Sequence, residues 1–288
     1  METKILGNRK KRLEELMKKA EKDPLINDII EKKEVQENRE KEILEVSESG
    51  ININLENVVI IISNDNLISA LYKDKLITFK ARPSRVTDFS MFNGRLCDIG
   101  EYHRVHDTFD DSIFGYIRAG LQGKVNALCE LEDELYCGAA TADGKGLIYN
   151  PKGDDIMRVE NPVTSLCAYG GELYFGDSKG FVYESKPENI KVSDVKTPIN
   201  ALCDYQLALY CAYRNRIRIT LAGKEKIRPG KVNAICHYGK TLFDGGKYGI
   251  YDMLFDIPIY DKTPVEAMIC IPEKLFVKEF LSKCKIKL

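Results

Sequence analysis

The sequence predicts an all-β fold, a seven-bladed β-propeller, from three observations. A branched aliphatic residue recurs at intervals of 28 to 39 residues, an apolar residue follows it ten positions later, and glycine-containing turns separate the short apolar runs. Such self-similarity is typical of arrays whose units bury their faces against each other. The opening residues are Val58, Val86, Val125, Val163, Ile199, Val232 and Val265, and their partners are Ile68, Leu96, Leu135, Leu173, Leu209, Leu242 and Leu275.

The copy that opens at Val163 outlines the strands of one unit. Apolar and β-branched residues predict strands over residues 163–169, 172–176, 181–183 and 190–195. Gly170 and Gly171 fit a two-residue hairpin turn between the first two strands. Strands that are apolar on both faces suit sheets packed between other sheets. Four antiparallel strands per unit, arranged radially, make a propeller blade.

The last copy predicts how the ring closes. Its third strand is expected after Ser282, and the sequence reaches Leu288 without a fourth strand. The alternating segment Ile51–Leu55 lies just before the first copy. Adding this segment to the seventh blade would remove an open sheet edge. The expected propeller is therefore closed by an N-terminal strand.

Residues 1–50 differ from the repeats, with 12 Lys or Arg and 13 Asp or Glu. Asn8 is a candidate N-cap for a helix whose apolar positions are Leu13, Leu16, Met17 and Ala20. Apolar residues further along are too sparse for a sustained coiled-coil seam. We predict a charged α-helical arm over 1–50 and the propeller over 51–288. The arm is either a solvated helix or a docking helix for a partner.

Composition limits the classes of partner. The formal net charge of -1 and the pI of 6.4 give no overall attraction to nucleic acid or anionic membrane. The longest aliphatic run, Val58–Ile62, is far too short to span a membrane, and no secretory signal is visible. We expect a cytoplasmic, monomeric protein without membrane contact.

The cysteines and histidines fit structural positions of the repeat. Four of the nine cysteines lie four residues after an opening residue, where the first and last copies carry Ile62 and Ile269. These cysteines are Cys129, Cys167, Cys203 and Cys236. This exchange indicates small buried hydrophobic residues. The sequence contains no CxxC pair of the kind that would suggest a metal site. His103 and His106 are three apart, so on a strand they point to opposite faces. We therefore predict no metal, no cofactor and no catalytic residue.

The passage Val163–Tyr183, with its strand, hairpin, strand, turn and strand, resembles the repeats of WD-repeat propellers. The resemblance covers residues 51–288 and is clearest between Val125 and Tyr251. The sequence departs from the WD pattern because it has no tryptophan, hence no Trp-Asp pair, and no Gly-His pair. Tyr149, Tyr183 and Tyr251 hold the aromatic position at the end of the third strand.

The resemblance implies that the residues around each opening position lie at the mouth of a central channel, where they are candidates for a binding surface. Tyr and Arg in the turn between the second and third strands extend it. The alternative is that these residues only make local hydrogen bonds at turns and strand starts. The candidates are Arg85, Lys124, Asn126, Asn200, Tyr213, Arg214, Arg216, Lys231 and Asn233.

The predicted function is a non-enzymatic protein-protein interaction scaffold that uses one face of a WD-like propeller, with the arm as a possible second docking element. This prediction rests on fold analogy. One alternative is a propeller that binds or converts a small molecule or carbohydrate at the channel mouth. A third is a nucleic-acid-associated protein that uses Asn8–Arg12 and the turn at Tyr213–Arg216.

Overall fold

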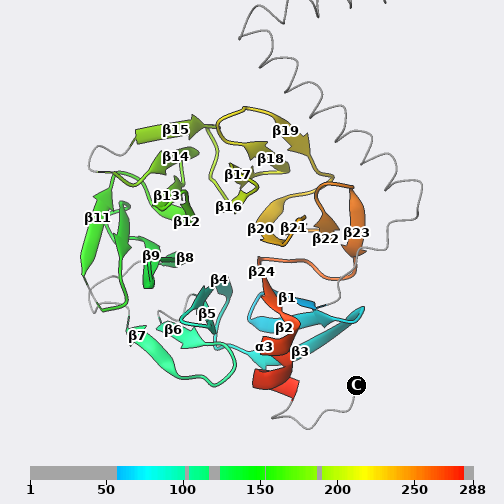
Figure 1. Cartoon of the computed structure of the whole chain (residues 1–288). Coiled ribbons are helices and arrows are strands. Elements are labelled where there is room, and N and C mark those ends of the chain that lie inside the picture. The colour runs from blue at the N-terminus through cyan, green and yellow to red at the C-terminus, as the bar shows by residue number, and fades with distance from the viewer. Residues whose placement is uncertain (1–56, 101–103, 117–123, 153, 187–189, 282–288) are drawn as a thin grey trace, which may run out of the picture. The chain divides into compact units, whose positions relative to one another are not determined.

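The computed structural model describes residues 57–100, 104–116, 124–152, 154–186 and 190–281. These residues form six four-stranded antiparallel sheets, arranged radially around a common centre (Figure 1). An all-β propeller is therefore confirmed, and each sheet is one blade. The predicted count of seven blades is wrong, because the described residues form six.

Three blades belong to the first half of the described chain. Blade 1 contains β24 (Ala267–Pro272), β1 (Val58–Asn64), β2 (Leu67–Tyr72) and β3 (Lys75–Ala81). Blade 2 contains β4 (Val86–Phe92), β5 (Arg95–Gly100), β6 (Arg104–Asp107) and β7 (Ile113–Tyr116). Blade 3 contains β8 (Val125–Leu131), β9 (Glu134–Ala140), β10 (Gly146–Tyr149) and β11 (Asp155–Val159).

Three further blades complete the ring. Blade 4 contains β12 (Val163–Tyr169), β13 (Glu172–Asp177), β14 (Phe181–Glu184) and β15 (Ile190–Asp194). Blade 5 contains β16 (Ala201–Tyr205), β17 (Ala208–Tyr213), β18 (Arg216–Ile219) and β19 (Glu225–Ile227). Blade 6 contains β20 (Val232–Tyr238), β21 (Thr241–Gly246), β22 (Gly249–Asp252) and β23 (Ile257–Tyr260). The first strand named in each blade lies nearest the centre (Figure 1), and we call it the innermost strand.

The ten-residue register predicts the second strands of blades 2 to 6. All five predicted partners lie in second strands and are at most 4% exposed. They are Leu96, Leu135, Leu173, Leu209 and Leu242. The four strands predicted from the copy at Val163 are also present, as β12 to β15. The repeat therefore specifies the interior of each complete blade.

Blade 1 explains the error in the blade count. The strand that opens at Val58 is not innermost; it is the second strand, and β24 from the other end of the chain pairs with it in antiparallel register. The copies at Val58 and Val265 are thus two parts of one blade. The misreading came from spacing, because Val58 and Ile68 repeat the ten-residue interval of the other copies. Burial distinguishes β1, since six of its seven residues are buried, whereas β4 and β8 leave three or more residues partly exposed.

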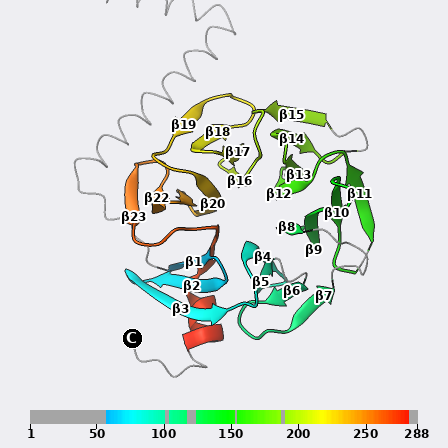
Figure 2. The ribbon, with the colours of Figure 1, turned by 180° about the vertical axis from the view of Figure 1, so that it is seen from behind.

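The predicted second strand at Leu275 is also wrong, because the chain after β24 is helical. A single α-helical turn, α3 (Glu273–Phe276), continues into a π-helical turn, η1 (Val277–Leu281). Comparison of the two opposite views places α3 on one face of blade 1 (Figures 1 and 2). The Phe276 ring packs within 6.4 Å of those of Tyr72, Phe79, Phe109 and Phe280.

The predicted arm and the predicted N-terminal closing strand both fall within residues 1–55. The arm over residues 1–50, the segment Ile51–Leu55 and the domain boundary between them lie outside the described residues. In the described part the ring is closed by β24, a C-terminal strand, on β1. The α-helix found there has four residues, so a coiled coil is not among the described elements.

A repeated sequence motif that was not predicted links blade 1 to blade 2 and blade 5 to blade 6. The sequence Lys-x-Arg-Pro occurs at residues 80–83 and at 226–229. In both copies the arginine lies four residues before an opening valine. Arg82 binds Asp98 through Nε at 2.9 Å and through Nη2, and also contacts Asp111. Arg228 similarly binds Asp244 and Asp256. Each arginine therefore carries a buried ion pair across a blade junction.

Candidate functional site

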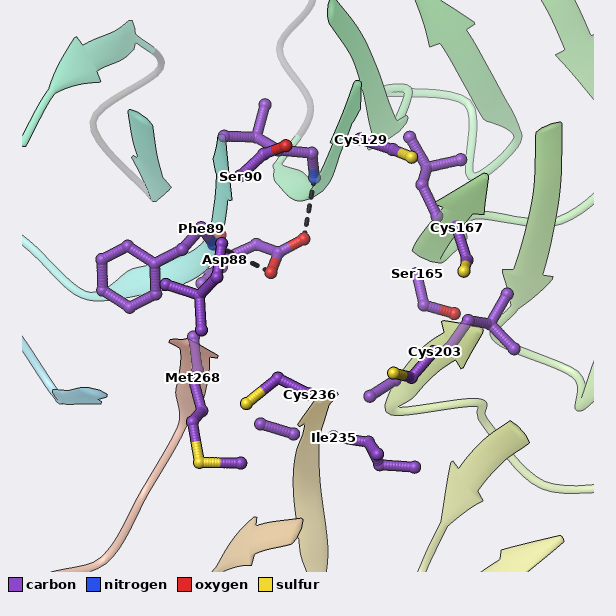
Figure 3. Close-up of a pocket in the computed structure, with 18 of the residues that line it drawn as sticks. Asp88, Phe89, Ser90, Cys129, Ser165, Cys167, Cys203, Ile235, Cys236 and Met268 are labelled. Atoms are coloured by element: carbon purple, nitrogen blue, oxygen red, sulfur yellow. Dashed lines mark hydrogen bonds between the residues drawn. The ribbon is translucent and has the colours of Figure 1, made fainter. Parts of the chain in front are cut away.

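A central channel of about 330 Å³ runs between the innermost strands. Each innermost strand has one neighbour in its own sheet, so half of its backbone N–H and C=O groups face this channel. Side chains from all six blades line it. Figure 3 shows Asp88 and Ser90 of blade 2, Ser165 of blade 4 and a series of cysteines around the opening.

Three of the predicted binding residues, Asn126, Asn200 and Asn233, line the channel. Their side-chain amides donate hydrogen bonds to the carbonyl oxygen of the next blade's opening residue, at 2.7, 2.7 and 2.9 Å. Thr87 makes the equivalent bond at 3.1 Å, and Ser63 makes it from blade 1 to blade 2 at 3.3 Å. These side chains therefore join neighbouring blades near the channel.

The other predicted binding residues lie outside the channel lining. Arg85 pairs with Glu266 at 2.8 Å. Arg216 pairs with Glu225 at 2.6 Å, and the Tyr213 hydroxyl donates to the same carboxylate. Arg214 occupies the turn between β17 and β18 with a φ of 47°. Lys124 and Lys231 immediately precede β8 and β20. The structure brings these residues to blade starts and second-to-third-strand turns, and their role in binding stays a prediction.

Asp88 is a carboxylate inside the channel wall. The equivalent positions, two residues after the opening residue, are alanine or serine in the other blades. Its carboxylate accepts hydrogen bonds from the N–H groups of Phe89 and Leu128, both at 2.8 Å, as Figure 3 shows. Burial raises the pKa of Asp88 to about 7, although both hydrogen bonds act to lower it. Asp88 therefore changes charge near neutral pH.

We expect Asp88 to make stability depend on pH. Its folded pKa lies above the unfolded value of about 3.9, so folding favours the protonated form and this contribution is lost as pH rises through 7. The loss is on the order of 3 kcal/mol between pH 4 and pH 8. The variant Asp88→Asn does not titrate. Thermal unfolding should show wild type losing stability relative to this variant from pH 5 to pH 8, and parallel profiles would contradict the assignment.

Cysteines line the channel on five consecutive innermost strands, from blade 3 round to blade 1. They are Cys129, Cys167, Cys203, Cys236 and Cys270. Burial raises the pKa of the Cys129 thiol to about 12 and that of Cys167 and Cys203 well above the usual value. Their thiols are therefore protonated at neutral pH. Among the described residues, no group of three or more His, Cys, Asp or Glu is placed to hold a metal ion.

The propeller has two faces that differ in their turns. One face, which we call the hairpin face, carries the turns between first and second strands and between third and fourth strands. Three exposed leucines occupy such turns in blades 5 and 6: Leu207 is 95% exposed, Leu221 74% and Leu254 43%. Exposed apolar side chains that share one face are candidates for a binding surface. Sequence reasoning missed this set because no leucine in it belongs to a repeated position.

Leu207 has the most unusual conformation of the three. It is the second residue of a two-residue hairpin, with a φ of 63°, where glycine or asparagine is favoured. Its carbonyl oxygen accepts a hydrogen bond from Tyr169 of blade 4 at 2.7 Å. The Tyr205 ring beside the turn packs 5.9 Å from His237, which lies 3.6 Å from Asp204. A strained, exposed leucine thus stands beside aromatic and acidic groups.

The blades and their channel define the protein as a β-propeller. No protein-family model matches the chain, and no curated protein does so either. Among solved structures, it is similar to a chain of a nidogen/laminin complex, with a TM-score of 0.58 and 11% identity over 74% of this chain and 98% of that one. It is also similar to a chain of the mitotic checkpoint complex, with a TM-score of 0.50 and 14% identity over 73% and 77%. These likenesses show the fold.

Proposed function

We propose that this WD-like propeller is a non-enzymatic protein-interaction scaffold that binds its partner through the hairpin face. The observation that carries the proposal is Leu207, a leucine that is 95% exposed in a backbone conformation suited to glycine. Strained backbone conformations cluster at functional sites. Leu221, which is 74% exposed, lies in the other turn of blade 5 on the same face. The two similar solved chains come from protein complexes, which is consistent with a protein partner.

Two carboxylates close to this surface bear on the partner's chemistry. Glu130 and Asp204 line the channel and lie next to the ends of β8 and β16, where the hairpin turns begin. No lysine or arginine is among the described residues that line the channel. We infer that the partner presents apolar side chains next to a lysine or arginine, because opposite charges steer and orient association. We further place the protein in a reducing compartment such as the cytoplasm, because its described cysteines are free thiols.

Two sets of variants separate this surface from the residues predicted around the blade starts. Leu207→Gly removes the side chain and relieves the positive φ, so the free energy of unfolding should stay unchanged or rise by up to about 1 kcal/mol. Quantitative capture from native extract should retain a protein on wild type and lose at least nine tenths of it on Leu207→Gly and on Leu221→Ser. Lys231→Ala should retain it.

The same experiment decides between the surfaces. A partner lost on Lys231→Ala and retained on Leu207→Gly would overturn the hairpin-face proposal and favour the residues at the blade starts. Equal retention on all variants would also contradict it. Thermal unfolding of every variant, measured in parallel, excludes loss of folding as the cause.

A second candidate function is binding of a small molecule in the channel. The specific observation is the channel volume of about 330 Å³, which lies at the lower end of the range for ligand pockets. The protein-interaction function is favoured over small-molecule binding because the exposed leucines lie on the surface, where a large partner has access.

None of the helices in the described part of the chain has the length and hydrophobicity needed to cross a membrane.

A further inference from the structure

Two channel thiols from different blades lie in contact. The sulfur atoms of Cys236 on β20 and Cys270 on β24 are 3.2 Å apart. A disulfide bond has a length of about 2.0 Å, so these are separate thiols that need to approach by only about 1.2 Å. The three other channel cysteines make a different contact, because their thiols lie against the carbonyl oxygen of the following residue: Cys129, Cys167 and Cys203.

The two thiols differ in access. Cys270 is partly exposed and lines the channel, so a small reagent entering the channel meets it first. Cys236 is 8% exposed. Burial raises the pKa of the Cys236 thiol well above its usual value, although the N–H of Cys270 acts to lower it. Cys270 is therefore suited to the first attack and Cys236 to the second, which requires only movement within the pair.

We propose that Cys236 and Cys270 form an oxidative modification site that takes a low-molecular-weight disulfide as its oxidant. The Cys270 thiol loses its proton to water, and the thiolate attacks one sulfur of the oxidant, forms a mixed disulfide and releases one thiolate. Cys236 then loses its proton to water, attacks the Cys270 sulfur and releases the second thiolate. The two released thiolates take up the two protons from water and become thiols. The protein dithiol is oxidised to one disulfide, and the oxidant is reduced to two thiols.

The position of this pair gives the modification a structural consequence. β24 is the strand that completes blade 1 by pairing with β1, and β20 is the innermost strand of blade 6. A bond between Cys236 and Cys270 therefore fixes the closing strand covalently to the preceding blade. Because a cross-link over 34 residues restricts the unfolded chain, it stabilises the closed ring.

The test uses the full chain and oxidised glutathione as the probe. After incubation and alkylation of the remaining thiols, peptide mass spectrometry without reduction should find Cys236 joined to Cys270. The Tm of wild type should rise by several degrees on oxidation and return on reduction. Cys236→Ser and Cys270→Ser should lose the rise, whereas the matched channel variant Cys203→Ser should keep it.

Three results would overturn the proposal. The first is that Cys270 remains fully open to alkylation after oxidation. The second is a disulfide that joins Cys270 to another cysteine, including Cys284, in place of Cys236. The third is an equal rise in Tm for Cys203→Ser and Cys236→Ser, which would show that the stabilisation does not come from a bond between Cys236 and Cys270. Thermal unfolding of the reduced variants shows that each serine protein is folded before oxidation.

Discussion

Replacing Arg82 with methionine should lower the free energy of unfolding by about 3–5 kcal/mol. The Arg82 side chain is 4% exposed and that of its partner Asp98 is 0% exposed, so the substitution leaves a buried carboxylate without the guanidinium. The same arginine also donates to the carbonyl of Asp107 at 3.2 Å and binds Asp111. Denaturant unfolding measures the change.

Two variants control this prediction. Arg85→Met breaks the pair with Glu266, which is partly exposed, and should cost less than about 1 kcal/mol. In the double variant Arg82→Met with Asp98→Leu, both charges are absent, and much of the lost stability should return. If Arg82→Met and Arg85→Met have equal effects, the buried pair does not join the blades as described.

Removing residues 267–288 should abolish cooperative unfolding of the propeller. Without β24, one edge of β1 is unpaired, and the buried residues Val59, Ile60 and Ile61 are exposed. The expected result is loss of the thermal transition and of the slowly exchanging amides throughout the ring, because a closed array depends on every junction. Hydrogen exchange and calorimetry measure both.

A point substitution in β24 gives the same test in a milder form. Ile271 is 0% exposed, so Ile271→Asp buries a carboxylate in an apolar site and should cost more than about 4 kcal/mol. The matched control is Ile156→Asp on β11, at a side chain that is 45% exposed, and it should change stability by less than about 0.5 kcal/mol. A stable Ile271→Asp protein would show that β24 is dispensable.

The sequence predicted the inside of each blade because that part depends on local patterning. Leu173 follows Val163 by ten residues in a hairpin whose turn is Gly170-Gly171, and the structure has this arrangement. The blade count depends on which strands pair across the chain. β1 shares with the innermost strands the opening branched aliphatic residue and the apolar residue ten positions later, but it has Val59 where they carry a polar residue. The spacing alone does not reveal that β1 pairs with β24.

Some signals for blade 1 were present in the sequence. Phe276 and Phe280 are four residues apart after Pro272, a spacing typical of a helix, and it contradicts a strand at Leu275. The paired Lys-x-Arg-Pro motifs at Arg82 and Arg228 were also readable, since both lie four residues before an opening valine.

The candidate sites were less accessible to sequence reasoning. Asn126 and Asn233 were predicted to face the channel or to make local hydrogen bonds. The structure shows their side chains bound to the next blade. Such contacts join residues that are distant in the sequence, so the local pattern does not reveal them. Leu207 is recognisable in retrospect, because Gln-Leu replaces a glycine-containing hairpin turn. The contact of Cys236 with Cys270 was hidden, because Cys270 lies one position outside the shared cysteine register.

The central claim, a six-bladed ring closed by β24 on β1, is tested most directly by a cysteine cross-link. In the antiparallel pairing, Ser63 lies opposite Ala267. In a seven-bladed ring with Val58 and Val265 as equivalent openings, Ser63 would instead lie level with Cys270. The protein Ser63→Cys/Ala267→Cys, prepared with Cys236→Ser so that Cys270 stays available, should form the 63–267 disulfide on mild oxidation. A 63–270 disulfide, identified by peptide mass spectrometry, would contradict the six-bladed ring.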